Sequence, residues 1–193
     1  MKSLLILVAG GSASGKSTVV REILDKAGLD DVLIIKHDDY YHDQKDVDME
    51  KRIKVNYDHP RSLDNELLEH QLSALLRGES VDKPVYDFVQ NTRADKTEHV
   101  VPKKVIIVEG ILILENERIR ALSDMNLYVE LDDDTRFIRR LLRDMKERNR
   151  SLDSVVNQYL TTVKPMFHRF IKPTNVTQMS SFLMTEAMIF RFI

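Results

Sequence analysis

The sequence predicts an α/β protein built on a mostly parallel sheet. Apolar runs at 4–9, 32–36, 104–110 and 125–130 are hydrophobic on both faces, as in strands covered by helices on either side. Helical patterns separate these runs, most clearly over 62–78, which opens on the capping residue Ser62 and ends on a glycine. The segment 81–103 breaks this rhythm with two short strand-like runs around a polar turn, which predicts a small antiparallel hairpin over one end of the sheet.

Composition narrows the class of protein. A chain of 193 residues suits one domain, and a formal net charge of −2 provides no global field toward a nucleic acid polymer or an anionic membrane. The absence of cysteine excludes disulfides, thiolate metal sites and a cysteine nucleophile. The first apolar run follows Met1 almost directly and is too short for a signal peptide or a membrane span, which predicts a cytoplasmic protein.

Residues 8–20, VAGGSASGKSTVV, join the first predicted strand to a helix. Their spacing matches G-x-x-x-x-G-K-[ST], the P-loop, in which bare backbone N–H groups and a helix N-terminus cradle phosphates. Lys16 is expected to reach the β- and γ-phosphates, and the Ser17 hydroxyl to help hold Mg²⁺. The predicted nucleotide-binding residues are Gly10, Gly11, Ser12, Ala13, Ser14, Gly15, Lys16, Ser17 and Thr18.

Carboxylates stand at the ends of two of the predicted strands. Asp38, in IIKHDDYYH, is a candidate to orient an acceptor hydroxyl and take its proton, although HDD alone is also typical of a solvated acidic turn. Glu109 ends the run VIIVEG, where a carboxylate near the P-loop serine suits Mg²⁺ and its waters. Ligands of open α/β sheets gather at this edge, which favours the functional interpretation of both residues.

Two further segments carry candidate acceptor contacts. In VNYDHPRSLDNE (55–66), Asp58 could hold sugar hydroxyls, and the same segment is also a well-formed helix entrance; the two interpretations are compatible. In PVYDFVQNTR (84–93), the ring and hydroxyl of Tyr86 suit a nucleobase, whereas Phe88 is expected to pack in the core.

Residues 132–150 carry seven arginines and lysines on a predicted helix and the turn after it. Arg136, Arg140 and Arg143 recur at i, i+4 and i+7 on one face, and Arg148 and Arg150 follow. Such a charge run is ordinarily a solvated face. Downstream of a P-loop, we instead expect a lid over 136–151 whose guanidinium groups neutralise a transferring phosphoryl group.

These motifs together resemble the uridine kinases (uridine–cytidine kinases) of the P-loop kinase group. The resemblance runs from about residue 4 to 173 and includes GGSASGKST, DDYY, NYDHPRSLDNE, PVYDF, EGIL, DTRFIRRLLRD, ER-x-RS and QY…VKPM. It implies a three-layer α/β/α P-loop NTPase fold with a mostly parallel five-stranded sheet, a hairpin insertion and a helical lid. It also implies transfer of the γ-phosphate of ATP or GTP to the 5′-hydroxyl of uridine or cytidine, a requirement for Mg²⁺, and a homo-tetramer.

The resemblance assigns roles residue by residue. By this resemblance, Asp38 corresponds to the general base of the family. Ser17, Asp38 and Glu109 correspond to its metal site. Its catalytic cations correspond to Lys16, Arg143 and Arg148. The residues expected at the nucleoside or acceptor site are Asp38, Tyr41, Tyr57, Asp58, Tyr86, Asn91, Arg140, Arg150 and Gln158.

The chain departs from the family pattern at three places. Asn91 stands where the family has a histidine that reads the pyrimidine edge, and Asn149 replaces a glycine, which an αL turn would tolerate. The tail 174–193 shows no strand pattern where the family has a final strand. Suitable codons for TNVTQMSSFLM read in a shifted frame as KRYANVIIPYD, so we hypothesise a single-base insertion or deletion near Thr174.

Two alternative functions remain open on the sequence. One is a related P-loop kinase of another small hydroxyl substrate, such as a phosphoribulokinase, although only Arg61 lies near Asp58 in sequence to hold a sugar phosphate. The other is a nucleotide-binding protein with little catalytic activity. In this alternative the altered tail impairs catalysis, and the protein serves as a regulatory or assembly partner.

Overall fold

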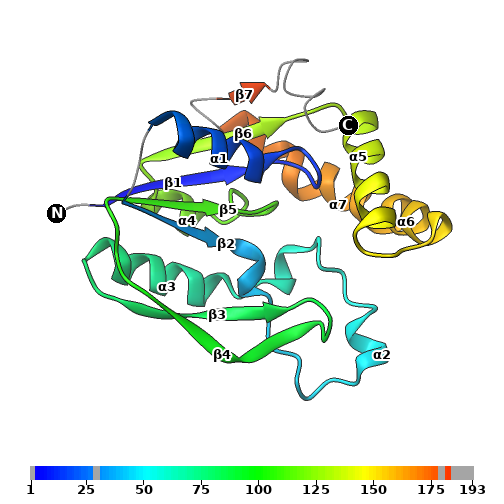
Figure 1. The fold of residues 1–193 in the computed structure, drawn as a ribbon, viewed down its shortest axis with the longest axis horizontal. Coiled ribbons are helices and arrows are strands. Elements are labelled where there is room, and N and C mark those ends of the chain that lie inside the picture. Colours follow the sequence, from blue (N-terminus) through cyan, green and yellow to red (C-terminus); the bar gives the residue numbers. More distant parts are fainter. Residues whose placement is uncertain (1–2, 28–30, 178–180, 184–193) are drawn as a thin grey trace.

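The computed structural model describes residues 3–27, 31–177 and 181–183 (Figure 1). The strands are β1 (Leu4–Ala9), β2 (Val32–Lys36), β3 (Val81–Asp87), β4 (Thr92–Val100), β5 (Val105–Glu109), β6 (Met125–Glu130) and β7 (Ser181–Leu183). The α-helices are α1 (Lys16–Ala27), α2 (Met49–Arg52), α3 (Asn65–Leu76), α4 (Glu117–Leu122), α5 (Asp133–Lys146), α6 (Leu152–Gln158) and α7 (Lys164–Met166). Short 3₁₀ or π segments are η1 (His37–Tyr40), η2 (Pro60–Ser62), η3 (Tyr159–Val163), η4 (Phe167–Ile171) and η5 (Lys172–Thr177).

The main sheet has five parallel strands, the number that the family resemblance implies, and their order is β2-β5-β1-β6-β7 (Figure 1). The register pairs Lys36 with Glu109 and Val8 with Glu109, so the carboxyl ends of β2, β5 and β1 meet at one edge. The chain leaves that edge through η1, the P-loop and Gly110. The candidate residues of three distant sequence segments therefore converge there.

Side-chain alternation along β1 divides the core into the expected three layers. Leu5 and Leu7 are fully buried against helices α3 and α4, in the cluster that also holds Leu72. Ile6 and Val8 point to the opposite face, where they pack with Val19 and Val20 of α1. A strand with both faces buried must be apolar throughout, which is why the run LLILVA was recognisable.

Strands β3 and β4 form the predicted antiparallel hairpin, with a bulge between Pro84 and Tyr86. Two buried or half-buried cations fasten it to the carboxyl edge of the main sheet. Lys83 Nζ lies 2.8 Å from Asp39 Oδ2, and Arg93 Nη2 lies 3.0 Å from Asp64 Oδ2. Arg93 Nε also donates to the carbonyl of Tyr41 at 2.8 Å. The hairpin is thus tied directly to η1 and to the start of α3.

The tail corrects one expectation. No strand was expected after residue 173, yet β7 pairs in parallel with β6, with Tyr128 opposite Ser181. Three residues suffice for this edge pairing because the backbone, rather than a side-chain pattern, supplies its hydrogen bonds. The rest of the tail, 178–180 and 184–193, lies outside the described residues, and the frame-shift hypothesis stays a prediction. Within the described part of the chain, no helix has the length and apolar character needed to cross a membrane.

Candidate active site

The loop between β1 and α1 folds into a tight backbone cradle around the Lys16 ammonium. Gly10, Ala13 and Gly15 take positive φ angles of 149°, 63° and 94°, which turn the chain sharply around the loop. Lys16 Nζ donates to the carbonyls of Gly10 at 3.0 Å and Gly11 at 3.1 Å, closing the loop from within. Burial lowers the pKa of Lys16 to about 8, and the carboxylates of Asp38 and Glu109 oppose that shift. Lys16 therefore lies beside both predicted acids.

The structure distinguishes the two adjacent aspartates of η1. Asp39 accepts from Lys83 Nζ at 2.8 Å and so fastens the hairpin. Asp38 instead lies among the phosphate-site charges: burial raises its pKa, Lys16 opposes the rise, and Glu109 adds to it. A carboxylate with a raised pKa that faces the P-loop lysine is suited to accept a proton.

Ser17 and Glu109 meet as predicted. Ser17 Oγ donates to Glu109 Oε1 at 3.1 Å, whereas Glu109 Oε2 is buried without a hydrogen-bond partner in the described structure. Among the described residues, no group of three or more His, Asp or Glu side chains could hold a metal ion. A hydroxyl, an unpartnered carboxylate oxygen and the nearby Asp38 nevertheless fit a small hard cation that keeps several waters and phosphate oxygens as ligands.

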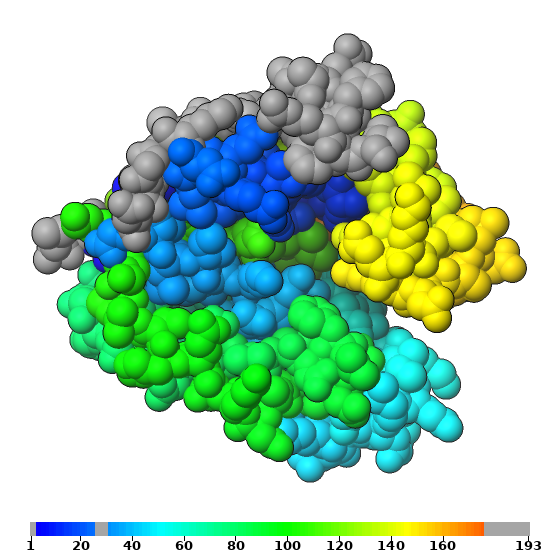
Figure 2. Space-filling model, in the orientation of Figure 1, coloured from blue at the N-terminus to red at the C-terminus, as the bar shows by residue number. Residues whose placement is uncertain are grey.

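A cavity of about 450 Å³ lies between the segment 53–58 and the helices after α5. Four of the predicted acceptor residues line it, namely Tyr57, Asp58, Arg150 and Gln158. Figure 2 shows the corresponding recess between the yellow surface of α5 and α6 and the cyan and green segments of α2 and the hairpin. Asp58 is only 9% exposed, and burial raises its pKa while Arg140 opposes that shift.

Three predicted tyrosines form one aromatic cluster beside this cavity. The ring of Tyr41 meets those of Tyr57 and Tyr86 edge-on, with centroid separations of 5.1 and 5.2 Å. The Tyr86 hydroxyl is buried beside the side chains of Tyr57 and Gln44, and burial raises its pKa. Because it lies in the aromatic cluster beside the cavity, this hydroxyl is a candidate for a ligand contact.

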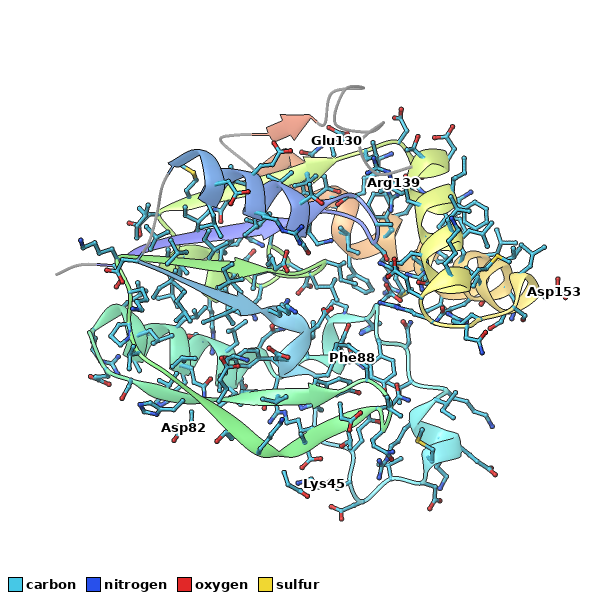
Figure 3. The ribbon with its side chains drawn as sticks, in the orientation of Figure 1. Lys45, Asp82, Phe88, Glu130, Arg139 and Asp153 are labelled. Carbon is cyan, nitrogen blue, oxygen red and sulfur yellow. The ribbon has the colours of Figure 1, made fainter. Side chains whose placement is uncertain are left out.

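The expectation for Phe88 was wrong. Phe88 is 61% exposed at the turn end of the hairpin, where its ring and that of Tyr86 meet edge-on with their centroids 5.2 Å apart (Figure 3). Alternation along β3 does place Tyr86 and Phe88 on one side, but the strand ends at Asp87 and the sheet no longer covers the residues of the turn.

Asn91 lies in the hairpin turn with φ 50°. Its carbonyl accepts from Gln44 Nε2 at 3.3 Å, and that amide also donates to the Tyr57 hydroxyl at 2.9 Å. Gln44 was not singled out in the sequence because it belongs to no recognisable motif. The assignment of the Asn91 side chain to the base edge stays a prediction.

The lid arginines do not all share one environment. Arg136 is 2% exposed and stacks its guanidinium 3.7 Å from the centre of the Phe167 ring, close against Gly11. Arg140 Nη1 donates to Ser12 Oγ in the P-loop at 2.7 Å, and its Nη2 donates to Gln158 Oε1 at 2.9 Å. Arg143, Arg148 and Arg150 of the lid form ion pairs with Asp144, which the sequence did not single out.

Asn149 has a φ of 51°, which is the left-handed conformation. Asparagine tolerates this conformation better than most residues other than glycine, so it can stand here in place of glycine. The Arg150 amide closes the turn after α5 by donating to the Asp144 carbonyl at 3.1 Å.

His37, next to Asp38, provides a test of burial at this edge. It is 1% exposed, its ring bonds Asn65 Oδ1 at 2.8 Å, and burial lowers its pKa to about 4. The unfolded chain binds a proton near pH 6.5 and the folded chain does not, so stability is full above that pH and falls below it. We expect a loss of about 3 kcal/mol between pH 7 and pH 4 from this group. Denaturant unfolding should show that slope in wild type and in His70→Gln but not in His37→Gln; an unchanged slope in His37→Gln would contradict it.

A parallel sheet, a glycine-rich phosphate cradle with its lysine, and acids at the neighbouring strand ends define a P-loop kinase. The chain belongs to the phosphoribulokinase/uridine kinase family, whose model matches residues 5–181.

Comparisons with known proteins agree with this assignment. A uridine kinase of Lactobacillus helveticus is 56% identical over 174 residues, covering 90% of this chain and 82% of the relative. A uridine kinase of Listeria innocua is 53% identical over 173 residues, covering 90% and 83%. Among solved structures, a putative fructose transport system kinase from Silicibacter matches with a TM-score of 0.73 at 20% identity over 94% of this chain and 89% of that one. The phosphoribulokinase from Rhodobacter spheroides matches with a TM-score of 0.69 at 16% identity over 94% and 70%, so these two share the fold.

Proposed function

We propose that the protein transfers the γ-phosphate of ATP or GTP to the 5′-hydroxyl of uridine or cytidine, giving UMP or CMP for pyrimidine salvage. The observation that carries the proposal is the placement of Asp38 beside Lys16 of the P-loop, with the cavity lined by Tyr57 and Asp58 opening nearby. The identity of 53–56% to curated uridine kinases over 90% of the chain supports the same reaction.

The donor triphosphate would lie in the loop 10–18. Its phosphate oxygens would take over the Lys16 ammonium, which otherwise donates to the Gly10 and Gly11 carbonyls at 3.0 and 3.1 Å. Arg140, already bonded to Ser12 of the loop, is placed to join them. The loop thus exchanges internal hydrogen bonds for bonds to phosphate, without a large rearrangement of its backbone.

The acceptor nucleoside would lie in the cavity between 53–58 and 150–162. The Asp58 carboxylate can accept bonds from both ribose hydroxyls, and the cluster of Tyr41, Tyr57 and Tyr86 provides faces and hydroxyls for the base. Asp38 orients the 5′-hydroxyl toward the γ-phosphate and accepts its proton as the new O–P bond forms. Arg143 and Arg148 of the lid neutralise the charge on the transferring group.

Ser17, Glu109 and Asp38 are the residues that would hold Mg²⁺. When bound, the ion draws charge away from the phosphate oxygens at the reacting end of the donor. The unpartnered Glu109 Oε2 supports this assignment. A cytoplasmic location is also part of the proposal, and so is a homo-tetramer, which depends on the family resemblance alone.

A coupled assay of ADP release tests the proposed reaction. With ATP and Mg²⁺, we expect turnover with uridine or cytidine and none above background with ribulose 5-phosphate, because the tyrosine cluster suits a base. Turnover with the sugar phosphate alone would favour the phosphoribulokinase alternative. Nucleotide binding by calorimetry without turnover on any acceptor would leave a nucleotide-binding protein and contradict the proposal.

A further inference from the structure

The carboxylate of Asp144 is fully buried in the last turns of α5. An ionised carboxylate removed from water costs several kcal/mol unless other charges or hydrogen bonds compensate it. The chain places this acid in the midst of the lid arginines rather than in the apolar core. Its surroundings therefore indicate a role in the lid.

Four arginines converge on the two oxygens of this carboxylate. Oδ1 accepts from Arg143 Nε at 2.9 Å and lies 2.8 Å from Arg143 Nη2 and 3.5 Å from Arg148 Nη1. Oδ2 lies 3.6 Å from Arg140 Nε and 3.7 Å from Arg150 Nη1. Two of the arginines come from α5 and two from the turn after it. One side chain thus joins both halves of the predicted lid.

The cluster is not neutral, because a single carboxylate faces four guanidinium groups. Only Arg143 is held by short bonds, and the pairs with Arg140, Arg148 and Arg150 are 3.5–3.7 Å long. Arg140 and Arg150 also donate to Ser12, Gln158 and Ser154, so the N–H groups left for phosphate oxygens are chiefly those of Arg143 and of the exposed Arg148. The carboxylate gathers the cations without saturating them.

The same arginines connect the two substrate regions. Arg140 donates to Ser12 of the P-loop, and both Arg140 and Arg150 donate to Gln158 at the acceptor cavity. The arginines gathered by Asp144 therefore reach from the donor phosphates to the acceptor. A misplacement of about 1 Å in such a set can cost on the order of a hundredfold in rate.

We infer that Asp144 is a positioning residue of the phosphoryl transfer, which holds Arg140, Arg143, Arg148 and Arg150 in the arrangement that neutralises the transferring group. The inference rests on the proposed function. Asp144 itself touches no reacting atom; it acts through the arginines. It also restrains their mutual repulsion before the triphosphate arrives.

The test compares kcat and KM for ATP in Asp144→Asn with those of wild type. The amide keeps the size of the side chain but removes its charge, so the arginines separate and kcat should fall about 10- to 100-fold. The site becomes more positive by one charge, so KM for ATP should stay the same or fall. A residue with a merely structural role would not lower kcat while leaving KM unchanged in the folded protein.

Asp153→Asn is the matched control. Asp153 is an exposed acid at the outer end of α6, pointing away from the molecule (Figure 3), and its removal should leave kcat and KM unchanged. A double-mutant cycle with Arg148→Gln adds a second readout, since the two losses in kcat should be less than multiplicative if Asp144 acts through Arg148.

The outcomes separate the inference from the proposed function. If wild type turns over no nucleoside, the proposed function fails. If wild type is active and Asp144→Asn retains its kcat, the inference fails. Should Asp144→Asn not fold by circular dichroism, Asp144→Glu replaces it, because it keeps the charge and displaces it by one methylene; an unchanged kcat, or the failure of both variants to fold, also overturns the inference.

Discussion

Replacing Asp38 by asparagine is expected to lower kcat by about 10²- to 10⁴-fold, the usual contribution of a positioned general base. The amide keeps the size of the side chain but cannot accept the proton of the acceptor hydroxyl. Affinity for the nucleotide measured without Mg²⁺ should change little, because the phosphates are held by the loop 10–18 and by Lys16. Steady-state kinetics give the first quantity, and calorimetric titration with a non-hydrolysable ATP analogue gives the second.

Asp39→Asn is the matched control, with the same chemistry one residue along the chain. Asp39 faces Lys83 rather than the P-loop, so its loss should weaken the attachment of the hairpin while kcat stays much closer to wild type. Lys83 keeps Glu98 as a second partner at 2.9 Å, which limits the cost in stability. If Asp39→Asn proved the more damaging of the two to kcat, the base would have to be reassigned.

The pH profile gives an independent check of the same residue. Burial raises the pKa of Asp38 above its usual range. The base must be ionised to accept a proton, so kcat should fall on the acid side at a higher pH than a water-exposed carboxylate would give. Asp38→Asn should lose that acid limb.

The parts of the site that could be predicted from the sequence share a property: their chemistry is local in the chain. The P-loop works through its own backbone, so Gly10, Gly15, Lys16 and Ser17 could be identified from spacing alone. Strand-end acids such as Glu109 could be placed because the end of an apolar run marks the end of a buried strand. The parallel sheet could be predicted because strands that are apolar on both faces alternate with helices along the chain.

The features that could not be predicted depend on contacts between distant segments. Asp38 was chosen over Asp39 without a local reason in the sequence; the structural reason is the contact of Asp39 with Lys83 of the hairpin, 44 positions further on, and that of Asp38 with the phosphate-site charges. Asp144 looks like one more charge on a charged helix until the fold brings Arg148 and Arg150 back to it. Phe88 follows the alternation of a strand, but its exposure depends on where the covering sheet stops.

Gly10→Ala is expected to have the largest effect on stability. A Cβ at Gly10 would lie 2.5 Å from the Val129 carbonyl oxygen and 2.7 Å from Ser14 Oγ, at a φ of +149° that L side chains rarely adopt. The carbonyl belongs to β6 and cannot move without disturbing the sheet. The clash and the backbone strain together should cost about 2–5 kcal/mol, and nucleotide binding should weaken at least about tenfold because the cradle is displaced.

Gly78→Ala separates the two contributions. Gly78 has a φ of +90° but nothing within 4 Å of the added Cβ, so the backbone conformation alone is strained there. We expect a cost of about 1–2 kcal/mol and unchanged nucleotide affinity, measured by denaturant unfolding and calorimetry. Equal losses of stability in the two variants would mean that close packing of the P-loop against β6 contributes nothing, and that φ alone requires a glycine at position 10.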